Sequence, residues 1–179
     1  KTRIYGRANK DWLSDLFQGR LAPAQLKKLA DEKEALFREL FAPVIKPVRG
    51  LKKFLKLLAK NNIARAIASS APPANIAFTL EKTGIRQYFD VILDESAIEK
   101  GKPDPEIYLK AAAAINFPAA RCLVFEDSLA GVAAAIKAGC KVIGVTTTHR
   151  KTEFIGVDEV IDDFEDLKLS QLKVLMDWR

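Results

Sequence analysis

The sequence predicts an α/β protein in which a doubly wound parallel sheet follows a helical segment. Three observations support this class. Strand-like and helical patterns alternate between residues 51 and 145, the residues before them show helical periodicity only, and glycine and proline stand where helices should end or begin. Such alternation is typical of parallel βαβ units, in which each helix returns the chain across the sheet.

The helical segment contains two stretches with apolar residues at helical spacing, residues 9–17 and residues 24–41. In the second stretch one face is apolar and the other carries Lys, Asp and Glu. Its apolar stripe consists of Leu26, Leu29, Leu36, Phe37, Leu40 and Phe41.

An extended connector is predicted over residues 42–48, because Pro43 and Pro47 disfavour helix at themselves and just before. We place a domain boundary in this connector. It separates a helical part, residues 1–43, from an α/β part, residues 44–179.

The α/β part has alternating periodicity to its end. Its predicted helices span residues 51–60, 74–83, 105–115, 129–138 and a last stretch from about 170. Its predicted strands span residues 63–68, 90–93, 122–125, 141–145 and 159–161. Gly84 and Gly139 fall where helices should end, and Asp104 with Pro105 forms an N-terminal cap followed by proline at the first helical position.

The composition is that of a globular protein, with 49% hydrophobic and 29% charged residues. An excess of 29 Lys and Arg over 23 Asp and Glu gives a net charge of +6, which favours an anionic partner. The basic residues are spread along the chain without a nucleic-acid-binding motif, so we expect no nucleic acid partner. We expect a monomer.

Neither a membrane span nor a secretory signal is predicted, so we expect a cytoplasmic protein without a membrane partner. Residues 51–60, LKKFLKLLAK, resemble a cationic membrane-surface helix when taken alone. Because the segment leads directly into a strand, we interpret its apolar face as covering a sheet.

Polar residues follow three of the predicted strands. In SSAPPAN, Ser69 and Ser70 precede a helix, where hydroxyl and backbone N–H groups can hold a phosphate oxygen. The alternative is that a serine here is only an N-cap. In EKGKPDPEIY, Lys102 lies on a proline-stiffened loop and could act as a fixed countercharge, whereas Lys100 is interpreted as an ordinary solvated lysine.

The third strand exit is LVFEDSLAG, in which Glu126 and Asp127 stand side by side. Two adjacent carboxylates repel each other unless a positive group lies beside them. A Mg2+ ion explains the pair, because this ion takes one or two carboxylates together with phosphate oxygens and waters. The alternative is that Asp127 or Ser128 caps the following helix while Glu126 points into water.

Together, the three exits predict a phosphoryl-transfer site. The carboxyl ends of parallel strands meet at one edge of a sheet, where open α/β proteins bind their ligands. A hydroxyl, a fixed cation and a metal site are the groups that stabilise a transferring phosphoryl group.

The order and wording of these motifs resemble the haloacid dehalogenase superfamily of phosphohydrolases, and within it the beta-phosphoglucomutase-like branch. The resemblance runs from about Lys46 to the end and is carried by IASSAP, KGKPDPEIYLKAA and LVFEDSLAGVAAAIKAG. It implies a Rossmann-like core with a helical cap domain, here only partly present, and Mg2+ as cofactor.

The resemblance also implies roles for the site residues. Ser69 would bind the transferring phosphoryl group, assisted by backbone N–H groups of Ser70 and Ala71. Lys102 would neutralise phosphate and nucleophile. Glu126 and Asp127 would be the acidic pair that positions Mg2+, with Asp127 as the direct ligand.

Such enzymes also need a nucleophilic aspartate and an acid–base aspartate in a DxDG motif at the end of the first core strand. No such motif occurs in this sequence. We therefore expect that the chain is a fragment of a longer enzyme and that its core lacks its first strand. A split or degenerate protein is the alternative.

In this branch the cap is inserted after that first strand, and YGRANKDW resembles the specificity loop of the cap. Arg7, Asn9 and Lys10 would then face the substrate. The alternative is an exposed basic turn before a helix.

The expected function is that of a Mg2+-dependent phosphatase acting on a small phosphorylated metabolite through an aspartyl phosphate. A mutase that returns the phosphoryl group to a hexose phosphate is one alternative. A non-catalytic fragment or binding protein is the other, since the sequence as written lacks the nucleophile.

Overall fold

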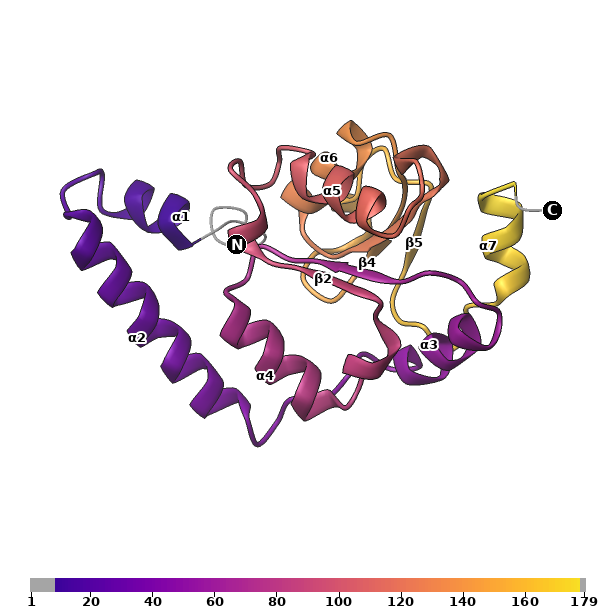
Figure 1. Cartoon of the computed structure of the whole chain (residues 1–179), viewed down its shortest axis with the longest axis horizontal. Helices are drawn as coiled ribbons and strands as arrows, with labels where there is room; N and C mark the ends of the chain where they lie inside the picture. Colours follow the sequence, from indigo (N-terminus) through magenta and orange to yellow (C-terminus); the bar gives the residue numbers. More distant parts are fainter. Residues whose placement is uncertain (1–8, 178–179) are drawn as a thin grey trace.

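The structure, a computed structural model, describes residues 9–177 and has α/β architecture (Figure 1). The α-helices are α1 (Asn9–Leu16), α2 (Pro23–Phe41), α3 (Leu51–Lys60), α4 (Pro73–Thr83), α5 (Glu106–Ala114), α6 (Leu129–Lys137) and α7 (Leu169–Leu175). The strands are β1 (Ala66–Ala68), β2 (Val91–Leu93), β3 (Leu123–Glu126), β4 (Lys141–Val145) and β5 (Glu159–Ile161). Short 3-10 turns lie at Arg86–Tyr88, Glu95–Ala97, Ala119–Arg121 and Lys151–Glu153.

The helical segment forms a pair, α1 and α2, that lies beside α4 and away from most of the sheet (Figure 1). This agrees with the predicted helical periodicity. Residues 45–48 between α2 and α3 form neither helix nor strand, as expected for the connector. Several apolar side chains of α2 are exposed in the described chain, namely Leu29, Leu36, Phe37, Leu40 and Phe41.

The five strands are all parallel to their partners, which confirms the predicted sheet type. They nevertheless form two sheets, with the orders β1-β2 and β3-β4-β5. The arrangement therefore differs from the single continuous sheet of a doubly wound fold. In the described chain β1 is paired only with β2, and β3 only with β4, so each has one strand edge without a β partner.

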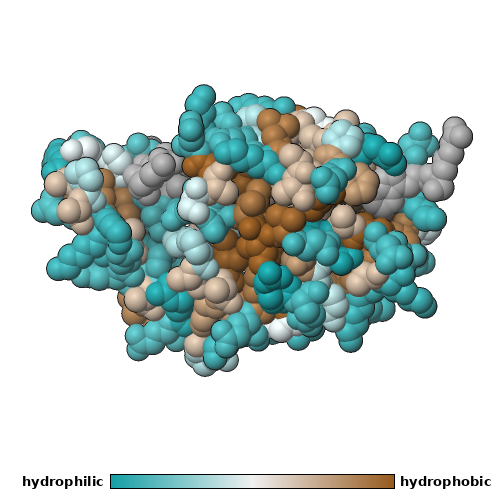
Figure 2. Space-filling view, viewed as in Figure 1, coloured by the Kyte–Doolittle hydropathy of each residue, from teal (hydrophilic) through white to brown (hydrophobic). Residues whose placement is uncertain are grey.

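An apolar cavity of about 690 Å³ lies between these two edges. Backbone and side chains of β1 line it on one side, β3 lines it on the other, and Phe54 and Leu58 of α3 close one face. Figure 2 shows apolar side chains gathered in the middle of the viewed face, over the strands that Figure 1 draws between α4 and α5. We refer to this space between β1 and β3 as the inter-sheet gap.

Burial differs between the strands in a way that the gap explains. Val142, Ile143 and Val145 of β4 are buried, because β4 has neighbours on both sides. All residues of β1 and β3 are only half-buried. The helix α3 buries Phe54, Leu55 and Leu58 against the core, which agrees with its interpretation as a sheet-covering helix.

Two predicted helix signals are found with small shifts. Gly84 ends α4 with φ of 61°, a left-handed conformation that glycine adopts at little cost. Helix α5 begins at Glu106, and Asp104 accepts a hydrogen bond from the Glu106 N–H at 3.1 Å. Within residues 9–177, no helix combines the length and the apolar character that crossing a membrane requires.

Candidate active site

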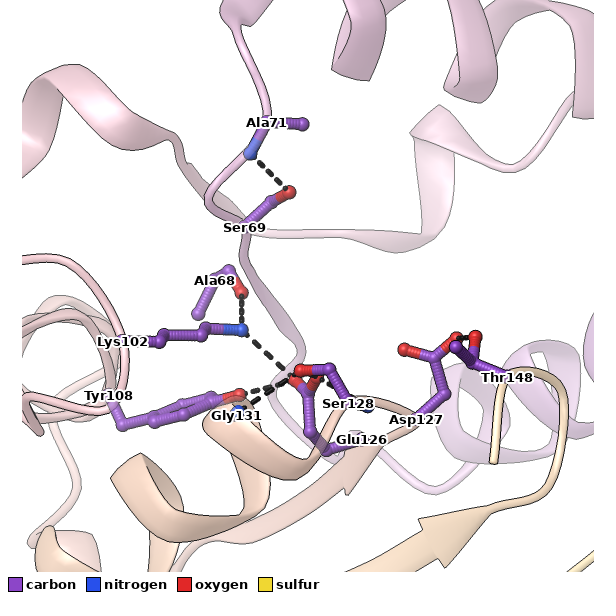
Figure 3. Close-up of polar contacts among 10 residues, drawn as sticks. All are labelled: Ala68, Ser69, Ala71, Lys102, Tyr108, Glu126, Asp127, Ser128, Gly131 and Thr148. Atoms are coloured by element: carbon purple, nitrogen blue, oxygen red, sulfur yellow. Dashed lines mark hydrogen bonds and ion pairs between the residues drawn. The ribbon is translucent and has the colours of Figure 1, made fainter. Parts of the chain in front are cut away.

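The polar residues predicted from the strand exits lie close together at the carboxyl ends of β1 and β3 (Figure 3). Ser69 directly follows β1, Glu126 is the last residue of β3, and Asp127 follows it. Lys102 reaches them from the loop before α5. The parallel strand arrangement therefore gathers these groups as the sequence predicts.

Lys102 and Glu126 form a buried ion pair across the inter-sheet gap. The Lys102 Nζ atom lies 3.0 Å from Oε2 of Glu126, and their side chains are 5% and 11% exposed. The same Nζ donates to the carbonyl oxygen of Ala68 at 3.3 Å. Lys102 thus connects the end of β1 to the end of β3.

The Glu126 carboxylate accepts further hydrogen bonds. The Tyr108 hydroxyl donates to Oε2 at 2.6 Å, and the Ser128 hydroxyl donates to Oε1 at 2.6 Å. Burial raises the pKa of Glu126, but the charge of Lys102 and these hydrogen bonds outweigh burial, so the pKa lies below its ordinary value of 4.5. Burial and the neighbouring Glu126 raise the pKa of Tyr108, which therefore remains a hydrogen-bond donor.

The first turn of α6 is shaped around this carboxylate. Ser128 is the N-cap of α6 and accepts a hydrogen bond from the Gly131 N–H at 3.0 Å, which confirms the cap expected in the alternative. The other half of that alternative is wrong, because Glu126 is paired with Lys102 and does not point into water. A Cβ atom on Gly131 would lie only 2.1 Å from Cδ of Glu126. Gly131 therefore leaves the room that the Glu126 side chain occupies.

Asp127 turns away from Glu126, because consecutive residues at a strand end point to opposite faces (Figure 3). Its Oδ2 atom accepts hydrogen bonds from the hydroxyls of Thr147, at 2.9 Å, and Thr148. The two adjacent carboxylates therefore have separate partners and do not form one pair.

The turn after β1 is organised by Ser69, whose Oγ accepts a hydrogen bond from the Ala71 N–H at 3.1 Å. Its O–H group is a donor that this bond does not use. The Ser70 hydroxyl is buried without a hydrogen-bond partner in the described chain. Pro72 and Pro73 at the start of α4 have no N–H group, so the turn itself supplies more donors than the helix terminus.

Of the carboxylates in this cluster, one is suited to bind Mg2+. Within residues 9–177, no group of three His, Cys, Asp or Glu side chains is close enough together to hold a metal ion. Glu126 is neutralised by Lys102, whereas Asp127 offers oxygen atoms of the kind that Mg2+ binds. Asp127 would therefore be the ligand from this chain, and Glu126 the residue that holds Lys102.

The residues predicted for the cap loop are only partly described. Arg7 lies outside the described residues, and Lys10 lies in α1 with its side chain outside them. Asn9 is buried, and its amide is bonded to Glu34, Trp12 and Lys33.

Sequence reasoning missed Tyr108, Thr147, Thr148 and Gly131. Tyr108 lies on the buried face of an alanine-rich helix, and a buried tyrosine hydroxyl requires a partner. That pattern could have indicated it. The threonines are about twenty residues from Asp127 in sequence, and no local pattern connects them to it.

Comparison with known proteins identifies the family of the chain. A family model described as haloacid dehalogenase-like hydrolase matches residues 2–139. The chain belongs to the haloacid dehalogenase-like hydrolase family. This confirms the resemblance inferred from the motifs.

Relatives of this haloacid dehalogenase-like chain include phosphatases and a mutase. It is 30% identical over 175 residues to the chloroplastic 5-amino-6-(5-phospho-D-ribitylamino)uracil phosphatase of Arabidopsis thaliana, covering 98% of this chain and 47% of that protein. It is 35% identical over 123 residues to the beta-phosphoglucomutase of Bacillus subtilis, covering 69% of this chain and 52% of that protein. The chain thus spans about half the length of these curated relatives.

The fold of the haloacid dehalogenase-like chain is also found among solved structures. A family IA, variant 3 hydrolase from Entamoeba histolytica superposes with a TM-score of 0.86 at 29% identity, covering 97% of this chain and 81% of that one. This likeness supports the Rossmann-like fold class.

Proposed function

We propose that the protein is a Mg2+-dependent phosphatase acting on a small phosphorylated metabolite, with an aspartyl phosphate as intermediate. The observation that carries the proposal is that Ser69, Lys102 and Asp127 lie around the carboxyl ends of β1 and β3, the two strands that border the inter-sheet gap. The phosphatase named among the relatives supports the reaction class.

The nucleophile is proposed to come from a strand that fills the inter-sheet gap. In the described chain, β1 and β3 each border the gap with an edge that has no β partner. A parallel strand between them would give the backbone N–H and C=O groups of these edges hydrogen-bond partners. Since all pairings are parallel, such a strand would end beside Lys102 and Asp127. Tyr108 and Glu126 are among the residues that line the cavity, so the added carboxyl end would reach the polar cluster.

Each site residue supplied by this chain has a proposed role. The hydroxyl of Ser69 and the N–H group of Ser70 bind phosphoryl oxygens, and the unpartnered Ser70 hydroxyl supplies a further donor. Lys102 lies between the two strand ends and neutralises negative charge that accumulates there. Asp127 would hold Mg2+, which supplies positive charge to phosphoryl oxygens when bound.

The chemistry is a double displacement at phosphorus. The aspartate oxygen forms a bond to phosphorus while the ester oxygen leaves as an alcohol, after taking a proton from an acid supplied with the same strand. Water then gives a proton to that group, now deprotonated, and attacks the phosphorus of the aspartyl phosphate, which releases inorganic phosphate and restores both the carboxylate and the acid. Buried Lys102 stays in place through both steps because Glu126 holds it.

A mutase is the second candidate, and the beta-phosphoglucomutase relative favours it. Mutase and phosphatase would use the same groups and differ in the acceptor of the phosphoryl group. Product analysis separates the two, since a mutase yields an isomeric sugar phosphate and a phosphatase yields inorganic phosphate.

The test uses the full-length protein, whose mass is measured first. A mass that corresponds to these 179 residues alone would favour the non-catalytic alternative. Phosphate release is then measured on sugar phosphates, ribityl phosphates, nucleotides and pyrophosphate, with and without Mg2+. Release from at least one compound, dependent on Mg2+, is expected.

Asp127→Asn should lower this activity by about a hundredfold or more, because removing a metal-binding or charge-stabilising group at such a site typically costs that much. Asp166→Asn, which changes an exposed acid outside the cluster, is the matched control. Calorimetric titration with Mg2+ gives a readout without turnover. Hydrolysis of none of the compounds, together with unchanged Mg2+ affinity in Asp127→Asn, would overturn the proposal.

A further inference from the structure

A second buried polar cluster joins the helical segment to the α/β part. Its centre is Glu34 of α2, which is 7% exposed. The Glu34 carboxylate accepts a hydrogen bond from Asn9 Nδ2 at 2.7 Å and another from Asn75 Nδ2. These three residues belong to α1, α2 and α4.

Charged neighbours fix the orientation of both asparagine amides in the cluster. Lys33 Nζ donates to Asn9 Oδ1 at 2.9 Å, and Arg38 donates to Asn75 Oδ1 at 2.6 Å. Each asparagine thus has a cation at its oxygen and Glu34 at its nitrogen. Turning either amide over would place its NH2 group against a cation and its oxygen against a carboxylate.

The Glu34 carboxylate is charged in the folded protein. Burial raises its pKa, but Lys33 and the two asparagine amides outweigh burial and lower the pKa below its ordinary value of 4.5. A buried carboxylate that loses one of its donors retains the desolvation cost without compensation. Breaking the contact with Asn75 should therefore cost free energy of unfolding.

The cluster lies at the contact between α2 and the first turn of α4. Asn75 is in the first turn of α4, only four residues after Ala71, and beside it Phe37 of α2 meets Phe78 of α4 edge to face with ring centroids 6.5 Å apart. Glu34 and Asn9 also line a cavity of about 640 Å³ between α2 and the loop that begins α4. Moving α2 away from Asn75 would change the width of this cavity.

We propose that Glu34 is a positioning residue that docks α1 and α2 onto α4 and thereby sets the distance between Asn9 and the Ser69–Ala71 turn. The proposal concerns the placement of the helical segment and does not depend on the reaction proposed above.

Exchanging the hydrogen-bond directions tests the contact. In Glu34→Gln, the new NH2 group faces the NH2 group of Asn9 or of Asn75, so one of the two contacts is lost. In Asn75→Asp, two carboxylates face each other. In the double variant Glu34→Gln/Asn75→Asp, the glutamine amide donates to the new carboxylate, and Arg38 remains paired with it, so the contact is restored at constant size.

The measurement is the distance distribution between spin labels placed on Gln18, in the turn between α1 and α2, and Lys82, near the end of α4, in the full-length protein. Both positions are exposed, and labels attached through a noncanonical amino acid avoid the native cysteines. Each single variant should lower the ratio of docked to undocked molecules about tenfold, and the double variant should recover most of that loss.

Glu32→Gln, which changes an exposed glutamate two residues away on α2, should leave the distribution unchanged. Thermal unfolding of the same samples shows that each variant is folded, and Asn75→Asp keeps the test available if Glu34→Gln folds poorly. An unchanged distribution in the folded single variants would overturn the proposal. A double variant no better docked than the single variants would also overturn it.

Discussion

The Nζ atom of Lys102 lies 3.0 Å from a carboxylate oxygen of Glu126, and both side chains are almost completely buried. Each charge makes the burial of the other possible. Because Lys102 also bonds to the Ala68 carbonyl, this pair connects the two sheets as well as forming the cationic part of the site.

Removing either partner of this pair should be strongly destabilising. Lys102→Ala or Glu126→Ala leaves one buried charge uncompensated, which is expected to lower the free energy of unfolding by about 3–5 kcal/mol. Urea denaturation measures this loss. Lys110→Ala removes the half-exposed partner of Glu106 and should cost less than about 1 kcal/mol. If Lys110→Ala lowered the free energy of unfolding as much as Lys102→Ala or Glu126→Ala, burial would not explain the stability that the Lys102–Glu126 pair provides.

Acid should weaken the fold partly through Glu126. Its pKa is lowered in the folded state, so its contribution to stability is fully present above the ordinary value of 4.5 and is lost as the pH falls through the folded-state pKa. Urea midpoints measured from neutral to acidic pH should therefore decrease less steeply below pH 4.5 in Glu126→Gln than in the unaltered protein. Identical slopes would assign the acid sensitivity to other carboxylates with lowered pKa values, such as Glu34 and Asp158.

Gly131→Ala should destabilise the protein by about 1–3 kcal/mol, although alanine favours helix over glycine by about 1 kcal/mol. The added Cβ would displace a carboxylate that Lys102, Tyr108 and Ser128 hold in place. Thermal unfolding measures the change. In a Glu126→Ala background the obstruction is gone, so the same substitution should be neutral or stabilising; destabilisation there would refute the steric explanation.

Thr148→Val should weaken Mg2+ binding by about tenfold, because the threonine hydroxyl orients the Asp127 carboxylate and groups that orient metal ligands typically contribute that much. Valine has a similar shape and removes only the hydrogen bond. Calorimetric titration of the full-length protein measures the affinity. Thr146→Val is the matched control, since the Thr146 hydroxyl bonds to Asp162 instead. Equal affinities of Thr148→Val and the unaltered protein would remove this role.

Helices and strands with an unambiguous apolar pattern were predicted closely. The helix predicted over residues 51–60 has the same bounds as α3. Its apolar stripe is buried, as the pattern indicates. The strand predicted over residues 63–68 is shortened to Ala66–Ala68. Ile63, which fits a strand pattern, instead lies in the turn after α3, where its N–H donates to the Leu58 carbonyl at 3.1 Å.

The site was predictable where it depends on strand order and not where it depends on side-chain direction. The ends of β1 and β3 bring Ser69 and Glu126 to one edge, as the alternation of helices and strands indicates, and Lys102 joins them from the loop before α5. The opposite directions of Glu126 and Asp127 follow from strand geometry, but their partners do not. The Glu34 cluster joins residues up to 41 apart in sequence, which no local pattern could reveal.

The inter-sheet gap has a consequence for the order of folding. Residues 51–93 contain the whole of one sheet, and residues 123–161 contain the other, so each can form from contacts that are short in sequence. The strand proposed to fill the gap would join the two sheets through contacts that are longer in sequence, with a larger loss of chain entropy. We therefore expect the two halves to assemble early and to come apart first along β1 and β3 when the protein unfolds.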